Sequence, residues 1–107
     1  MTEKPPAHLK PATALWFTSV VEDYELDQHH VRLLTLAAEA WDRGQGAREL
    51  VAMEGICYAD RFGAPRIHPA VAVERDAVLA FARLVRELRL SDDEPPDAPR
   101  LPRQGQR

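Results

Sequence analysis

Prolines divide this chain into two windows in which long regular structure can form. Three prolines lie near the start, four lie near the end, and only Pro65 and Pro69 fall inside. Because proline lacks a backbone donor and clashes with the preceding helical turn, long helices are confined to residues 12–64 and 70–94. The folded part is therefore about 80 residues, which is one small domain.

A domain of this size has little room for a catalytic cleft. Its core rarely supplies more than ~3–5 kcal/mol without disulfides, a metal or oligomerisation. Cys57 is the only cysteine, so no disulfide forms within the chain. No apolar run reaches the ~18 residues of a membrane span, and residues 1–10 lack the apolar centre of a signal peptide. These features predict a cytosolic protein without a membrane anchor.

The two ends of the chain differ in composition from its centre. Residues 1–10 contain two adjacent prolines, and residues 91–107 contain four prolines and seven charges. Such segments bury too little apolar surface to offset the entropy of ordering. We expect flexible tails at 1–10 and 91–107, on either side of a helical oligomerisation domain at 11–90.

The domain is predicted to be mainly α. A short helix is expected from Pro11 to Asp23, with the proline in its first turn. Asp27 fits a helix N-cap, and a helical pattern continues from there to Glu54, with Gly55 as the stop. This second helix would be roughly 42 Å long, so it needs another long helix beside it.

Two glycines interrupt the pattern of the long helix. Gly44 and Gly46 each cost about 1 kcal/mol relative to alanine in a helix interior. They allow a kink or a break at this point.

A small β-hairpin is predicted after Gly55. Apolar and polar residues alternate at the start of the segment 56–68, and turn residues surround Gly63. A second long helix then begins at His68 or Pro69, with the proline in its first turn, and runs to Leu90.

The two long helices are expected to fold back as an antiparallel hairpin, because each has a row of residues at steps of three and four. In the first helix this seam consists of Val31, Leu34, Ala38, Trp41, Gln45 and Arg48. In the second it consists of Val71, Glu74, Val78, Phe81, Val85 and Leu88. Residues that face each other then have numbers that add up to about 122.

Each seam contains one charged residue. In this register Arg48 falls opposite Glu74. We predict a buried ion pair between them; the alternative is that both side chains extend separately into water.

No group of residues indicates catalysis or metal binding. His29 and His30 are neighbours that point about 100° apart on a helix, so they cannot chelate as an i, i+4 pair does. Cys57 lies among apolar residues of a predicted strand and is expected to be a small buried hydrophobe. The sequence therefore predicts a protein that is not an enzyme and that has no catalytic residues, metal or cofactor.

The two tryptophans allow two interpretations. Trp16 lies on the short helix and Trp41 on the seam of the long one, where a core position is the default. The alternative is that either packs across a subunit boundary, where tryptophan is enriched.

The order of short motifs along residues 11–90 resembles that of the small terminase subunits of tailed bacteriophages. It is most similar to the short branch found in phages and in prophage-derived particles. Its most specific parts are the connection from Gly55 to Pro69 and the helix from Glu74 to Leu88. The motifs are Trp16 to Val21, Asp23-Tyr24-Glu25-Leu26, His30 with Leu33 and Leu34, Ala38-Glu39-Ala40-Trp41-Asp42-Arg43, Ala47-Arg48-Glu49-Leu50, Gly55, Asp60-Arg61-Phe62-Gly63, His68-Pro69-Ala70-Val71, Glu74-Arg75-Asp76, and Phe81-Ala82-Arg83-Leu84 through Arg86-Glu87-Leu88.

The resemblance implies a non-enzymatic, ring-forming homo-oligomer of the DNA-packaging motor. Such a subunit engages double-stranded viral DNA and regulates the large terminase subunit, an ATPase and nuclease, in the cytoplasm of the bacterial host. The paired long helices would form the body of each subunit, side by side in the ring. The sequence leaves open whether the particle is a phage or a gene transfer particle.

The acidic charge of the chain limits how it could hold DNA. With 14 basic and 17 acidic residues its net charge is −3, whereas phosphate binding needs clustered cations. A ring that repeats weak basic positions can gain affinity by multivalency. The expected phosphate contacts are Lys4, Lys10, Arg100, Arg103 and Arg107. The alternatives are that the tails only solubilise, or that the C-terminal tail docks on the large subunit.

A second function of another class is also consistent with the sequence. The same seam could serve a small dimeric helical DNA-binding regulator, of the transcriptional or toxin-antitoxin type. A regulator would be a dimer that reads a short two-fold site, whereas a packaging ring would have many subunits and weak sequence preference.

Overall fold

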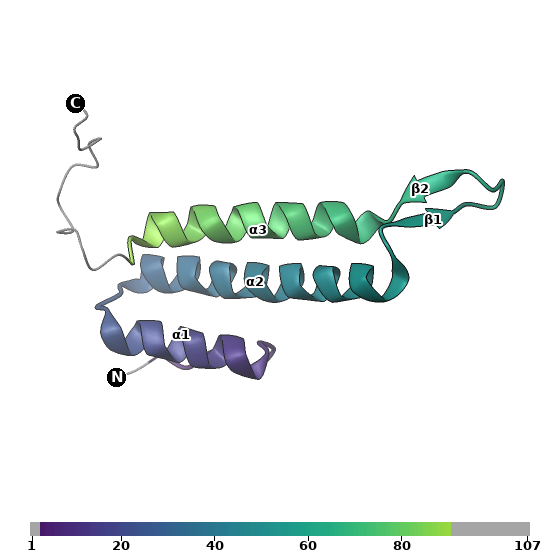
Figure 1. Cartoon of the computed structure of the whole chain (residues 1–107). Helices are drawn as coiled ribbons and strands as arrows, with labels where there is room; N and C mark the ends of the chain where they lie inside the picture. The colour runs from purple at the N-terminus through teal and green to yellow at the C-terminus, as the bar shows by residue number, and fades with distance from the viewer. Residues whose placement is uncertain (1–2, 91–107) are drawn as a thin grey trace, which may run out of the picture.

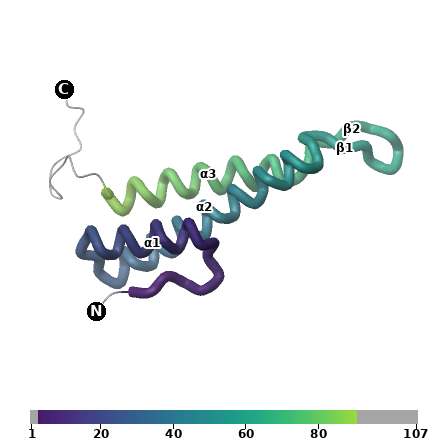
Figure 2. The backbone as a smooth tube through the Cα atoms, turned by 60° about the horizontal axis from the view of Figure 1, so that its bottom comes forward, coloured from purple at the N-terminus to yellow at the C-terminus, as the bar shows by residue number. Residues whose placement is uncertain are grey.

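The computed structural model describes residues 3–90 as three helices and a two-stranded sheet (Figure 1). Helix α2 lies between α1 and α3, and the sheet extends beyond the paired ends of α2 and α3 (Figures 1 and 2). The mainly helical fold, with a short first helix and a helical hairpin joined by a small β-hairpin, is confirmed. The elements are α1 (Pro11–Asp23), α2 (Gln28–Glu54), β1 (Cys57–Ala59), β2 (Pro65–Ile67) and α3 (Pro69–Leu88).

The helix ends follow from local capping chemistry. The Asp27 carboxylate accepts a hydrogen bond of 2.9 Å from the backbone N–H of His30, which satisfies one free donor at the start of α2. α2 ends at Glu54, and the cap residue Gly55 that follows it has a φ of 92°, which favours glycine. α3 ends at Leu88, two residues before the predicted end, because Arg89 adopts a left-handed conformation.

His68 joins the ends of the two long helices. Its Nδ1 accepts a hydrogen bond of 3.0 Å from the backbone N–H of Ala70 and so caps α3. An accepting Nδ1 places the proton of the neutral imidazole on Nε2, which donates to Oε1 of Glu54 at 2.7 Å. The last residue of α2 is therefore tied to the residue that precedes α3.

α2 and α3 pack antiparallel in the predicted register. The rings of Trp41 and Phe81 lie 5.0 Å apart between centroids, and Glu54 is bonded to His68. The residue numbers in each of these pairs add up to 122. The alignment of the hairpin therefore follows from folding back about the connection 56–68, with the steps of three and four marking the rows that face each other.

The face that α2 turns to α3 differs from the predicted seam in the second half of the helix. A Cβ at Gly44 would lie only 3.3 Å from the Cβ of Ala77, so the two backbones approach closely there. Close approach requires small side chains. In this part of α2 the row that faces α3 is Ala40, Gly44 and Ala47, each one position before the predicted Trp41, Gln45 and Arg48. The buried residues of α2 are Leu34, Ala37, Ala38, Ala40, Gly44 and Ala47.

The predicted ion pair between Arg48 and Glu74 is wrong. Among residues 3–90, neither side chain takes part in an ion pair, and Arg48 is exposed. The cause is the rotated face of α2, which buries Ala47 and turns its neighbour Arg48 to the side. The two charges extend separately, which was the alternative.

α2 continues through both glycines without a break. Gly44 is buried against α3, where its missing side chain permits the close approach to Ala77. A Cβ at Gly46, in contrast, would meet nothing within 4 Å. The packing of α2 against α3 therefore explains the glycine at position 44 but not the glycine at position 46.

The hydrophobic core lies where α1, the first half of α2 and the end of α3 meet. Phe17 and Leu34 are its largest fully buried side chains. The hydroxyl of Tyr24, just after α1, donates to the backbone carbonyl of Leu90, just after α3. The core residues are Leu9, Phe17, Val20, Leu34, Ala38 and Leu88.

The start of α1 is fixed to α2 by polar contacts. The Asp42 carboxylate accepts hydrogen bonds from the backbone N–H of Lys10 and from the hydroxyl of Thr13. Leu9 is buried in the core, and His8 is paired with a glutamate of α2. Residues 8–10 therefore pack against α2, although the sequence placed them in a tail. The buried side chain of Leu9 and the carboxylates of α2 hold them there.

Candidate interaction surfaces

The seam residues divide into three environments. Val31 is half-buried beside the core, which contains Leu34, Ala38 and Leu88. Val71, Phe81 and Val85 are half-buried on α3. Trp41 and Val78, which we expected to be covered by the partner helix, are 45% and 55% exposed. Part of the predicted seam therefore lies on the surface of the helical hairpin.

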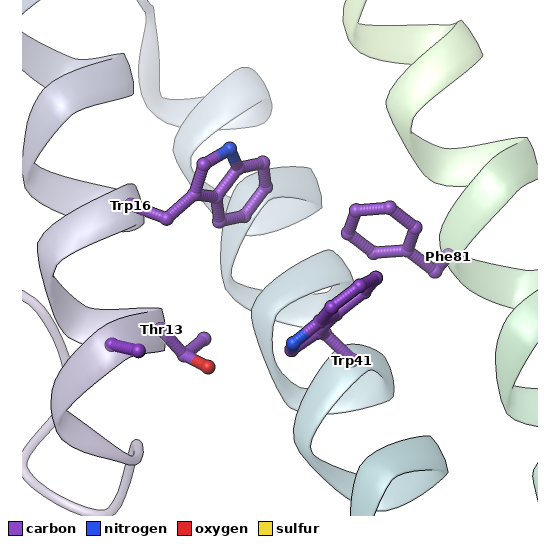
Figure 3. A pocket seen from close by; sticks show the side chains of 5 residues that line it. Thr13, Trp16, Trp41 and Phe81 are labelled. Atoms are coloured by element: carbon purple, nitrogen blue, oxygen red, sulfur yellow. The ribbon is translucent and has the colours of Figure 1, made fainter.

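The three helices form an apolar pocket of about 300 Å³ (Figure 3). Each helix contributes one aromatic ring: Trp16 from α1, Trp41 from α2 and Phe81 from α3. The centroid of the Phe81 ring lies 5.7 Å from that of Trp16 and 5.0 Å from that of Trp41, in tilted orientations. Ala12 and Thr13 complete the lining, so no charged side chain borders the pocket.

A smaller hollow of about 40 Å³ continues the pocket between α2 and α3. It shares Trp41 and Phe81 with the pocket and adds Ala40, Gly44, Gln45, Ala77 and Val78. Trp16 is half-buried and packs against the core, whereas Trp41 is 45% exposed. Contact of either tryptophan across a subunit boundary stays a prediction.

The segment between α2 and α3, residues 56–68, projects from the helices as an arm (Figures 1 and 2). β1 and β2 are antiparallel, and every residue of both strands is exposed. Paired residues share one face of a sheet, so one face of the arm is entirely apolar and uncovered within the described chain. An isolated two-stranded hairpin is marginally stable in water. The apolar face consists of Cys57, Ala59, Pro65 and Ile67.

Asp60 organises the tip of the arm. Its Oδ1 accepts hydrogen bonds from the backbone N–H groups of Phe62 at 2.8 Å and Ala64 at 3.0 Å. Its Oδ2 accepts from Nε of Arg66 at 2.9 Å. One carboxylate thus fixes both sides of the turn, and Gly63 supplies the left-handed residue with φ of 83°.

The tip presents an arginine and a phenylalanine to solvent. Phe62 is 79% exposed, and the guanidinium of Arg61 lies 4.9 Å from the centre of its ring. In the sequence both residues were noted only as part of the motif Asp60-Arg61-Phe62-Gly63, and neither was predicted to be a site residue. The sequence did contain a signal for the exposure of Phe62, because a large apolar residue at the tip of a turn has no core to enter.

The expectation that Cys57 is a small buried hydrophobe is wrong: Cys57 is exposed. The apolar neighbours that suggested burial, Ile56 and Tyr58, are themselves exposed. The arm extends beyond the helices, so no other part of residues 3–90 covers this strand.

We expect the tip of the arm to loosen in acid. The Arg66 guanidinium and the backbone N–H groups, Ala64 first among them, hold the pKa of Asp60 below its ordinary value. The contribution of this carboxylate to stability is therefore complete above about pH 3.9, the ordinary aspartate pKa, and is lost as pH falls through the lower folded-state pKa.

An NMR pH titration tests this expectation. The amide signals of Phe62 and Ala64 should move toward random-coil positions in acid while the helical circular dichroism signal is kept. Asp60→Ala should produce the same change at neutral pH. The control is Asp76→Ala, which removes an exposed carboxylate on α3. Arm signals that stay unchanged in Asp60→Ala would contradict the role of this residue.

The predicted DNA contacts are only partly within the described residues. Lys4 and Lys10 are exposed, and the ammonium of Lys10 lies 3.9 Å from a carboxylate oxygen of Glu49. Arg100, Arg103 and Arg107 lie outside residues 3–90. The structure does not bring the two lysines together with a further basic cluster in the part it describes.

Two kinds of feature are absent from residues 3–90. These residues hold no group of three or more side chains suited to bind a metal ion. They also include no helix with the length and apolar character needed to cross a membrane. Comparison of the chain with protein-family models, with curated proteins and with solved structures gave no match.

Proposed function

We propose that this chain is a small terminase subunit, a non-enzymatic adaptor that forms a homo-oligomeric ring, engages double-stranded DNA and regulates the large terminase subunit. The order of sequence motifs suggests the family. The fold supports it, because an elongated helical hairpin of about 80 residues provides little core of its own. The site of action would be the cytoplasm of a bacterial host.

The observation that carries this proposal is the amount of apolar surface left open. The arm exposes one complete apolar face, and the pocket exposes aromatic rings from all three helices. These surfaces lie at different places on the molecule, as contacts between successive subunits of a ring require. Contiguous exposed apolar surface of this kind marks an interaction site.

The mass of the full chain in solution tests this proposal. Light scattering and native mass spectrometry should show a closed oligomer of more than two subunits. A protein that is a monomer at all working concentrations would overturn it. A dimer that binds a short two-fold DNA site would overturn it in favour of the regulator.

The role in packaging needs a second measurement. The oligomer should bind duplex DNA with weak sequence preference and should change the ATPase rate of the large terminase subunit. Lys4→Ala with Lys10→Ala, and separately Arg100→Ala with Arg103→Ala and Arg107→Ala, should weaken DNA retention and lower its salt dependence. An oligomer that affects neither DNA nor the ATPase would contradict the adaptor role.

A further inference from the structure

We propose that the arm of one copy of this chain inserts Phe62 into the aromatic pocket of the next copy. This inference rests on the proposed function, in which the chain is a ring-forming oligomer, and it names the contact between subunits. The arm and the pocket match in size, in charge and in geometry.

Size is the first argument. The pocket holds about 300 Å³, which is at the lower end of the range for small-molecule sites. It therefore suits a single side chain better than a large ligand. Phe62 projects from the tip of the arm with 79% of its surface exposed, and Asp60 holds the turn that carries it. A fixed aromatic side chain loses little conformational freedom when it binds.

Charge is the second argument. Arg61 accompanies Phe62 at the tip, and the pocket offers the faces of two tryptophans, which attract a guanidinium more strongly than other rings do. The net charges of the two parts agree with this. The arm carries Arg61 and Arg66 against Asp60, a net charge of +1, whereas the helical part, residues 3–54 and 69–90, carries nine basic and twelve acidic residues, a net charge of −3.

Geometry makes the contact intermolecular. Trp41 lies thirteen residues before the end of α2, which is roughly 20 Å along the helix axis. The arm leaves that end of the hairpin and points away from α1 (Figure 1). It cannot reach the pocket of its own chain. Arm and pocket are different surfaces, so their contact is heterologous and repeats from copy to copy until a ring closes.

The intrinsic fluorescence of the protein reports on this contact directly, because both tryptophans of the chain line the pocket. On dilution the oligomer should dissociate. The fall in its measured mass should be accompanied by a red shift of the tryptophan emission and by stronger quenching with acrylamide. Phe62→Ala should show the spectrum of the dissociated protein at every concentration. Met53→Ala removes another exposed apolar side chain, on α2, and should behave as the wild type.

Mixing two variants tests the head-to-tail geometry. Phe62→Ala leaves the pocket intact, and Ala12→Phe fills the pocket from its exposed rim but leaves the arm intact. Each variant alone should be a monomer with a wild-type circular dichroism spectrum. An equimolar mixture should form a 1:1 dimer and nothing larger, because only one arm and one pocket remain competent. This dimer should restore the blue-shifted tryptophan emission.

The possible failures are distinguishable. A wild-type protein that stays monomeric overturns the proposed function and this contact together. If Phe62→Ala keeps both the mass and the emission of the wild-type oligomer, the ring stands and the contact is wrong. A mixture of the two variants that gives no dimer also overturns the contact.

Discussion

Phe17→Ala is expected to lower the free energy of unfolding by ~3–5 kcal/mol, the usual cost of deleting a large aromatic side chain from a core. Phe17 is 1% exposed and holds α1 against α2 and α3. A domain of about 80 residues has a total stability of only ~4–12 kcal/mol. Urea denaturation at fixed protein concentration should therefore show a strongly lowered midpoint, with α1 released from the helical hairpin.

Leu15→Ala is the matched control for this change. Leu15 lies on the same helix but is 73% exposed, so the free energy of unfolding should change by less than ~0.5 kcal/mol. Hydrogen exchange should show early loss of protection in α1 for Phe17→Ala alone. Equal effects of the two substitutions would mean that α1 does not contribute to the core as described.

Gly44→Leu is expected to destabilise the contact between α2 and α3 by ~1–3 kcal/mol or more, the cost of overpacking a closely packed site. Even a Cβ at this position would lie 3.3 Å from that of Ala77, and leucine adds three further carbons in the same direction. The helices must move apart, which also disturbs the nearby contact between Trp41 and Phe81. Thermal unfolding followed by circular dichroism measures the loss.

Gly46→Leu provides the opposite result in the same helix. Nothing lies within 4 Å of a Cβ there, and replacing glycine with a good helix former gains up to about 1 kcal/mol. Both substitutions change the helix propensity by the same amount. The difference in stability between Gly44→Leu and Gly46→Leu therefore measures the effect of packing alone. Equal stability of Gly44→Leu and Gly46→Leu would contradict the close approach of α2 and α3 at Gly44.

The element bounds could be predicted because they depend on local chemistry. Pro11 and Pro69 open helices, Asp27 caps α2, and Gly55 ends it, and each acts through its own backbone or side chain. The register of the hairpin followed from the place of the connection 56–68 between the two helices, together with the spacing of residues along them. These features required no knowledge of how closely the helices approach.

The rotation of α2 could not be predicted in the same way. Periodicity gives most weight to bulky apolar residues, so it placed Trp41 at the centre of the seam. The structure instead buries Ala40, Gly44 and Ala47, because small residues permit the shortest distance between backbones. A pattern of alanine and glycine carries little hydrophobic signal, and the error displaced Arg48 from its expected partner.

The candidate sites depended on tertiary position and were largely missed. Trp16, Trp41 and Phe81 come from three helices, and their common pocket exists only once the helices are packed. The exposure of Cys57 and Phe62 follows from the arm extending past the ends of α2 and α3. Local sequence shows that a hairpin forms, but it does not show that the hairpin lies outside the core.

The bond between Tyr24 and Leu90 closes the end of the molecule opposite the arm. It holds the end of α3 beside the junction of α1 and α2. α2 separates this closed end from the arm by roughly 40 Å. A partner that covers the arm therefore leaves the opposite end of the three helices uncovered.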